Sequence, residues 1–392
     1  MHGAGHAQPG RPGTVYVIGG GPAGLAAGAE LRRNGMRPVI LERGDSVATS
    51  WRAGYDRLHL HTARALSGLP GFAIPRRYGR WPSRDAVIDY LEQYRVRHDL
   101  EVRAHTEVER IEDARSVSGG DVFWVIHTTT GEQFSAHAVI VATGNHHTPW
   151  TPQWPGLASY TGTLLHSRQY RNPAPFAGQD VLVAGAGNTG TEIAADLAGG
   201  GARRVWIAVR TPPHIVARDV AGVPSQAAGI LASHLPGPLV DWASVRQATD
   251  LSAYGLPRPV DGVFTYLARD RRVAVQDVGF VGAVRAGQVT PVAAVASIEG
   301  GKVTLADGSV LSPQVVIAAT GYRCGLEKLV GQLGVLDDRG LPKVHGGAPA
   351  APGLYFLGYT ISARGALREI AAEARRIGSA LADAGTFQQK TG

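Results

Sequence analysis

Two segments of this 392-residue chain, about 165 residues apart, follow the same pattern. The first spans residues 14–45 and the second spans residues 180–211. Each contains an apolar run of strand length, a glycine-rich turn, a helix rich in Ala and Leu, a glycine break and a second apolar run. This order is typical of a βαβ unit, whose two strands pair in parallel through a crossover helix. The repeat therefore predicts an α/β fold with two doubly wound, Rossmann-like domains.

The order of the other strand candidates indicates that one domain interrupts the other. Apolar runs that end in an Ala-Thr-Gly turn occur at residues 138–149 and 315–323, on either side of the second βαβ segment. We therefore expect a discontinuous first domain, formed by residues 14–150 and 315–392, with a second domain inserted at residues 151–314.

Two stretches lack this regular pattern. Residues 1–13 have no apolar core of the kind found in a signal peptide, so they are expected to form a disordered leader. Residues 211–260 are rich in Ala, Pro and Leu and are expected to form loops with short helices. An insertion of this length either caps a substrate site or is a packing excursion, and the sequence leaves both alternatives open.

Composition narrows the class of protein. The formal net charge of +7 comes almost wholly from arginine, because the chain has only four lysines and all of them follow residue 300. The arginines are scattered and form no block of like charges, so no nucleic-acid partner is expected. No run of 18 apolar residues occurs without charges, which predicts no membrane span and favours a cytoplasmic location.

The first glycine-rich turn has the spacing of a dinucleotide-binding site. In Gly19-x-Gly21-x-x-Gly24, the first glycine permits a tight turn, the second admits a diphosphate and the third allows close helix–strand packing. The following helix offers free N–H groups and a partial positive charge. Glu42 ends the next strand, where a carboxylate can hold ribose hydroxyls.

The second turn, Gly185-x-Gly187-x-x-Gly190, repeats this geometry with Asn188 and Thr189 inside it. Its following strand ends in Arg210 rather than in an acid. An arginine at that place can pair with a 2′-phosphate, so the turn favours NADP over NAD.

Two dinucleotide sites, one nested in the other, imply electron transfer between FAD and NADPH. A reduced flavin can pass electrons to a disulfide, to a quinone or to oxygen. The disulfide route needs a redox-active cysteine pair. Cys324 is the only cysteine of the chain, so the chain cannot supply such a pair.

The segment between the two turns points to oxygen. Tyr160-x-Gly162-x-x-x-His166-x-x-x-Tyr170 resembles the fingerprint of the class B flavin-dependent monooxygenases, and the resemblance extends over most of the chain. "YDRLHLHTARALSGLP", "HSRQYRN" and "ATGYR" are most similar to YUCCA-type and related bacterial members. Tyr170 stands where Baeyer–Villiger enzymes have Trp, which disfavours that reaction.

The resemblance implies a two-step cycle. NADPH reduces FAD, and NADP stays bound while oxygen forms a C4a-hydroperoxyflavin that transfers one oxygen atom to a small organic substrate. N- or S-oxygenation and oxidative decarboxylation of a 2-oxo acid both fit, with a Baeyer–Villiger monooxygenase and a non-catalytic FAD-binding redox sensor as alternatives. A homodimer is compatible with the sequence.

The resemblance also suggests catalytic residues. We expect His61, with Thr62 beside it, to contact the reactive face of the flavin, although a purely structural histidine is an equal alternative. Arg258 resembles a residue near the nicotinamide. His146 and His147 lack partner carboxylates at a useful spacing, so no metal site is expected. The remaining cofactor-binding residues expected on this basis are Pro22, Ala23, Arg43, Trp51, Thr143, Gly144, Thr211, Thr320, Gly321 and Gly358.

Overall fold

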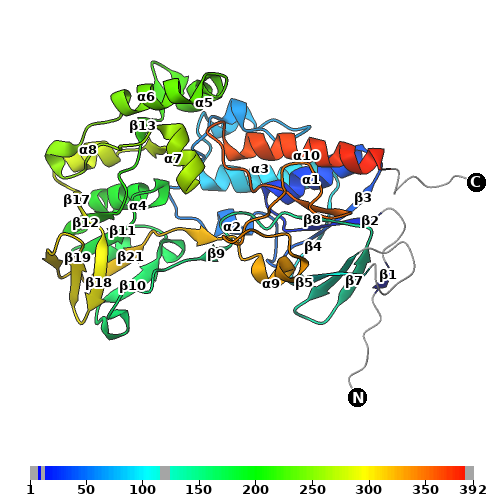
Figure 1. Ribbon diagram of the computed structural model, residues 1–392, viewed down its shortest axis with the longest axis horizontal. Coiled ribbons are helices and arrows are strands. Elements are labelled where there is room, and N and C mark those ends of the chain that lie inside the picture. The colour runs from blue at the N-terminus through cyan, green and yellow to red at the C-terminus, as the bar shows by residue number, and fades with distance from the viewer. Residues whose placement is uncertain (1–7, 10–13, 115–123, 385–392) are drawn as a thin grey trace, which may run out of the picture.

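The computed structural model describes residues 8–9, 14–114 and 124–384, and it shows a mixed α/β protein with parallel sheets. In Figure 1 the beginning and the end of the chain, blue and red, lie together on one side, and the middle, green to yellow, lies on the other. The described segments lack a helix that is long and apolar enough to cross a membrane.

The first and last parts of the chain share a five-stranded parallel sheet. Alternate residues of its strands face opposite sides, as expected for a pleated strand. Val15 and Val17 pack with the helices of this part, whereas Tyr16 and Ile18 pack against a second, mostly antiparallel sheet. The strands, in spatial order, are β23 (Leu354–Phe356), β8 (Ala138–Val141), β2 (Thr14–Ile18), β3 (Arg37–Leu41) and β4 (Glu101–Arg103).

Helices and a second, smaller sheet cover the two faces of this sheet. The small sheet has the strand order β1-β7-β6-β5. Its two-residue strand β1 comes from the expected leader, and its other strands do not. The rest of the leader expected at residues 1–13 lies outside the described residues. The elements are α1 (Pro22–Arg33), α2 (Thr49–Arg52), α3 (Arg84–Arg97) and α10 (Ala366–Asp383), with β1 (Gln8–Pro9), β5 (Val108–Asp113), β6 (Trp124–Thr128) and β7 (Gln133–Ala136).

The middle part of the chain forms a second five-stranded parallel sheet. Its strand order is β10-β21-β11-β12-β17. One face packs against α4 and α8, and the other packs against the antiparallel strands β18, β19 and β20. The bounds are β10 (Thr163–His166), β11 (Asp180–Ala184), β12 (Arg204–Val209), β17 (Thr290–Ala293), β21 (Val315–Ala318), α4 (Asn188–Gly199), α8 (Phe280–Arg285), β18 (Val295–Glu299), β19 (Lys302–Leu305) and β20 (Val310–Leu311).

The boundary expected at residue 315 is too early. β21 pairs in parallel with β10 and with β11, so residues 315–318 belong to the second sheet. The chain returns to the first sheet only after the Ala-Thr-Gly turn that follows this strand. The crossing itself is short: β22 (Tyr322–Arg323) pairs antiparallel with β9 (Thr148–Pro149), which lies on the outward crossing.

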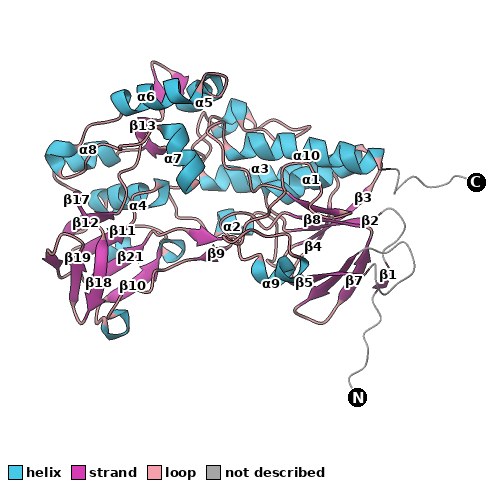
Figure 2. Ribbon diagram, viewed as in Figure 1, coloured by secondary structure: helices cyan, strands magenta, loops and turns pink. Residues whose placement is uncertain are grey.

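The stretch after β12 projects from the second sheet as a layer of short elements. Figure 2 shows these helices in the upper half of the view, on the same side as α3 and α10, and most strands below them. The elements are β13 (Ile215–Ala217), β14 (Asp219–Val220), β15 (Val223–Pro224), α5 (Ser225–Ala232), α6 (Gly237–Gln247), α7 (Val263–Asp270) and β16 (Val275–Asp277), while α9 (Glu327–Val330) follows the return crossing.

The third glycine of each turn lets the helix sit directly on the turn. A Cβ atom at Gly24 would lie 1.8 Å from the carbonyl oxygen of Gly19, and one at Gly190 would lie 1.9 Å from that of Gly185. Both obstacles are backbone atoms, so neither can rotate away.

Gly24→Ala is therefore expected to lower the free energy of unfolding by about 3 kcal/mol, the upper end for an overpacked core position. Gly28→Ala, one turn later on α1, is the matched control, because its Cβ would meet only the tips of Ile40 and Leu100 at 3.2 Å. Thermal unfolding of both variants checks this. Equal stability of the two would contradict the packing role of Gly24.

Candidate functional site

A cavity of about 1840 Å³ extends between the two five-stranded sheets. Both glycine-rich turns line it, as do the two Ala-Thr-Gly turns. Ligands of open α/β sheets bind at this carboxyl edge of the strands. The expected cofactor residues that line the cavity are Gly19, Gly21, Pro22, Ala23, Glu42, Arg43, Trp51, His61, Thr62, Thr143, Gly144, Gly185, Gly187, Asn188, Thr189, Arg210, Thr211, Thr320, Gly321 and Gly358.

Three expected site residues are not part of this lining. Gly24 and Gly190 lie behind their turns, where they act through helix packing. Arg258, expected near the nicotinamide, has an exposed side chain whose guanidinium lies 2.9 Å from Asp250. It lies in the loop between α6 and α7 and is absent from the cavity lining, so the structure does not bring Arg258 to the cavity.

The first turn is shaped for an anionic ligand. Gly19 has φ +109°, a left-handed conformation that favours glycine, and its N–H donates to Leu41. A Cβ at Gly21 would meet nothing within 4 Å, so there is open space above the start of α1. The helix N-terminus directs unpaired N–H groups into that space, which fits a diphosphate.

The carboxylate of Glu42 is buried beside this turn. Its Oε2 accepts from the backbone N–H of Gly20 at 2.6 Å, and its Oε1 accepts from Gly44 at 2.8 Å and from the Thr49 hydroxyl at 3.1 Å. Each carboxylate oxygen can accept two hydrogen bonds. Oε2 therefore keeps one acceptor position, which fits a ribose hydroxyl.

The second turn has the same form. Gly185 has φ +118°, and the position of Gly187 is again open. The side chain of Asn188 accepts from the backbone N–H of Gln276 at 2.8 Å, which ties the turn to the projecting layer. Arg210 lines the cavity and forms no hydrogen bond or ion pair with any residue that the structure describes. A free guanidinium at the end of β12 fits a phosphate group.

The His166 ring connects the fingerprint segment to the return crossing. Its Nδ1 accepts from the backbone N–H of Arg168 at 3.1 Å, so the ring proton lies on Nε2, which donates to the Gly321 carbonyl at 3.0 Å. Burial lowers the pKa of His166 and keeps the ring neutral. Gly162 is needed for the chain path, because a Cβ there would lie 2.8 Å from the Gln314 carbonyl oxygen.

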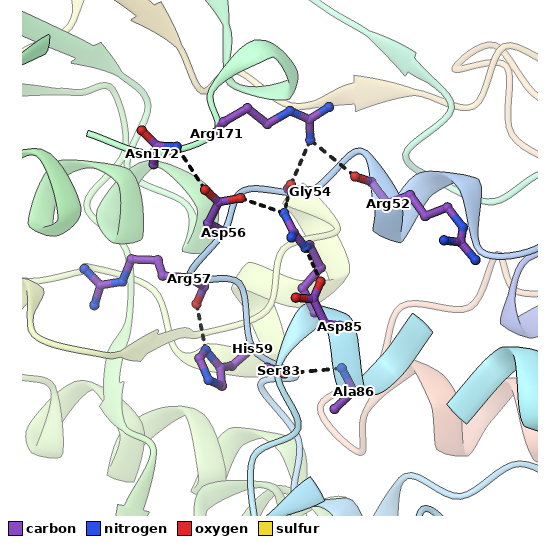
Figure 3. A network of polar contacts seen from close by, with 11 residues as sticks. Arg52, Gly54, Asp56, Arg57, His59, Ser83, Asp85, Ala86, Arg171 and Asn172 are labelled. Carbon is purple, nitrogen blue, oxygen red and sulfur yellow. Dashed lines mark hydrogen bonds and ion pairs between the residues drawn. The ribbon is translucent and has the colours of Figure 1, made fainter. Parts of the chain in front are cut away.

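The two residues directly after the fingerprint segment hold the loop that leads to His61. Figure 3 shows Arg171 donating to the Gly54 carbonyl at 2.8 Å and Asn172 donating to Asp56 at 2.9 Å. Arg84, on α3, donates to the other oxygen of Asp56 at 2.8 Å. These bonds keep the pKa of Asp56 below its usual value and fix the loop between the two sheets.

His61 lies at the wall of the cavity, with a side chain that is 27% exposed. Its Nε2 is 3.2 Å from Oε1 of Glu192, a carboxylate on α4 that is only 3% exposed. Burial, followed by the charges of Arg218 and His59, lowers the pKa of His61 to about 4. Thr62, beside it, forms a hydrogen bond of 2.7 Å with Ser67.

Glu192 is a residue that the sequence did not single out. An acid in the Ala/Leu-rich helix after the second turn looks like an ordinary exposed position. The available signal was its place directly before the apolar pair Ile193 and Ala194, both of which are buried.

Comparison with known proteins gives consistent results. A family model described as pyridine nucleotide-disulphide oxidoreductase matches residues 16–217. The indole-3-pyruvate monooxygenase YUCCA1 of Oryza sativa subsp. japonica is 33% identical over 358 residues, which covers 89% of this chain and 87% of that protein. A flavin-containing monooxygenase from Stenotrophomonas maltophilia is 29% identical, with a TM-score of 0.70 over 94% of this chain and 98% of that chain. Cyclohexanone monooxygenase, 18% identical with a TM-score of 0.69 over 95% of this chain and 88% of its own, shares the fold.

Arg258→Ala is expected to have little effect on dinucleotide binding or on stability, because an exposed ion pair contributes about 0–1 kcal/mol. Isothermal titration with the reduced dinucleotide and a thermal melt check this. A tenfold loss of affinity for the reduced dinucleotide would show that Arg258 does take part in binding.

Proposed function

This chain belongs to the class B flavin-dependent monooxygenases, and on that premise we propose that FAD binds at its first glycine-rich turn and NADPH at its second. Residues 14–150, with the segment after residue 320, would form the FAD part, and the segment between them the NADP part. The observation that carries the proposal is the single cavity lined by both turns.

The second site is proposed to select NADPH through Arg210. Asp270 is close enough to Arg210 for the guanidinium charge to lower its pKa, but it is already held by Arg269 through two hydrogen bonds of 3.0 and 2.9 Å. The guanidinium of Arg210 therefore stays available for a 2′-phosphate. Thr211 lines the cavity next to it and can add a hydroxyl donor.

FAD, when bound, supplies the chemistry: it takes a hydride from NADPH and lets one oxygen atom of O₂ enter the substrate while the other leaves as water. The residues of the chain bind, orient and shield. Glu42 holds the ribose, the helix α1 N-terminus holds the diphosphate, and His61 borders the reaction space. Residues of the projecting layer between 211 and 276 line one side of the cavity and would shield it from water.

A small 2-oxo acid is the first substrate class that we propose, with amines and sulfides next. The rice relative is named for indole-3-pyruvate, which is a 2-oxo acid. Lys328 and Arg339 line the cavity, and within the described segments neither side chain forms an ion pair, which suits an anionic substrate. Ester formation is less favoured, since the likeness to cyclohexanone monooxygenase extends to the fold alone.

NADPH is expected to bleach the flavin of the purified protein under anaerobic conditions, as followed by its visible absorption. Admission of air with a 2-oxo acid, an amine, a sulfide or a ketone then identifies the substrate by product formation per NADPH consumed. A flavin that NADPH does not reduce would reject the monooxygenase reaction and favour a redox sensor.

Arg210→Ala is expected to weaken NADPH binding by about 1.5–3 kcal/mol, or roughly 10- to 150-fold, through loss of a charge-assisted contact. NADH lacks the 2′-phosphate, so its Michaelis constant should change little. Steady-state kinetics with both dinucleotides check this, with Arg258→Ala as the control. Equal losses for NADPH and NADH would refute the phosphate contact.

A further inference from the structure

A buried carboxylate faces the cavity histidine across the boundary between the two parts of the chain. Glu192 lies on α4, in the second part, and its side chain is 3% exposed. His61 lies on a loop of the first part, with its Nε2 at 3.2 Å from Oε1 of Glu192. The other oxygen, Oε2, accepts from the buried hydroxyl of Tyr55 at 2.7 Å.

The carboxylate of Glu192 and the ring of His61 lie close together but do not form a hydrogen bond. Oε1 of Glu192 and Nδ1 of His61 are both buried, and neither has a hydrogen-bond partner within the described part of the chain. A buried polar atom without a partner is costly. A small rotation of the ring would turn the 3.2 Å approach into a hydrogen bond, so the two groups are suited to share a proton.

Each group is electrically neutral over part of the ordinary pH range. Burial raises the pKa of Glu192 to about 7, against the opposing hydrogen bond from Tyr55 and the charge of Arg218. Burial also lowers the pKa of His61 to about 4. Between these values an acid faces a neutral ring, and above pH 7 a carboxylate faces a neutral ring. The charged or titratable groups around the pair are Tyr55, Arg57, His59, Asp196 and Arg218.

A neutral imidazole has one N–H and one acceptor nitrogen. A carboxylate can only accept, so an ionised Glu192 requires the ring proton to lie on Nε2 of His61. A protonated Glu192 can donate to Nε2, which then requires the ring proton to lie on Nδ1. The state of the acid thus selects the tautomer of the ring.

We propose that Glu192 is a positioning residue that determines which nitrogen of His61 carries the proton, so that the pair stores one proton in the wall of the reaction cavity. Gaining or losing that proton exchanges the donor and acceptor ends of the ring. When the pair loses a proton, the carboxyl proton passes from Oε1 of Glu192 to Nε2 of His61 and the ring releases its other proton from Nδ1. Uptake of a proton reverses both transfers, so one proton is exchanged and no oxidant or reductant is needed. The inference deepens the proposed function, since it names how His61 is held in that same cavity.

The test is the tautomer of His61, read from ¹⁵N chemical shifts of the FAD-loaded protein labelled at histidine. His61→Gln assigns the signal by removing it. In the unmodified protein the Nδ1–H tautomer is expected below about pH 7 and the Nε2–H tautomer above it. Because this measurement uses no turnover, it can succeed or fail independently of the monooxygenase reaction.

Glu192→Gln is expected to abolish the change of tautomer between pH 5 and pH 9, since the amide does not titrate. Glu30→Gln is the matched control: Glu30 is also a buried helix carboxylate, it is paired with Arg33, and it does not line the cavity. In that control the change of tautomer should remain.

Tyr55→Phe supplies a second test if Glu192→Gln folds poorly. The Tyr55 hydroxyl stabilises the carboxylate and lowers its pKa, so its removal should move the midpoint of the change upward by about one pH unit. A tautomer that stays constant in the unmodified protein, or that changes identically in Glu192→Gln, would overturn the proposal. So would an unmoved midpoint in Tyr55→Phe.

Discussion

Parallel pairing within the two five-stranded sheets determines where the glycine-rich turns and the Ala-Thr-Gly turns lie. All strands of a parallel sheet end at the same edge, so β2 and β11 deliver their glycine-rich turns to the edges at which the neighbouring strands also end. The Ala-Thr-Gly turns after β8 and β21 arrive there for the same reason. One cavity then serves both turns, and the helix N-termini of α1 and α4 both open into it.

Much of this arrangement could be predicted from the sequence. A turn that needs positive φ, or that lies against a backbone carbonyl, requires glycine, so the spacing of the glycines identifies the turn. The turn glycines and Glu42 lie where their spacing indicated. The boundary at residue 315 was wrong, because an apolar run before Ala-Thr-Gly has the same appearance in either sheet. Arg258 could not be placed, because irregular loops have no periodicity that fixes their direction. Glu192 was missed, because sequence alone does not distinguish an acid on a buried helix face from one in solvent.

The net charge does not distinguish arginines that are paired with acids from arginines that are free to bind an anion. Many arginines are paired with acids of the same chain, as Arg32 is with Asp99, where both side chains are exposed. Such pairs at the surface contribute little to stability. Arg210 differs because it stands free at the cavity, so its position, and not the overall charge of +7, bears on anion binding.

The antiparallel pair formed by β9 and β22 has a mechanical consequence. The chain passes between the two sheets twice, and at these passages Thr148 pairs with Arg323 and Pro149 pairs with Tyr322. Two separate tethers would allow each sheet to twist and slide against the other. Two tethers joined side by side behave as one flat strip, which bends easily about a single axis and resists rotation about the others. Any opening of the space between the sheets would therefore favour bending across this strand pair over twisting or sliding of one sheet against the other.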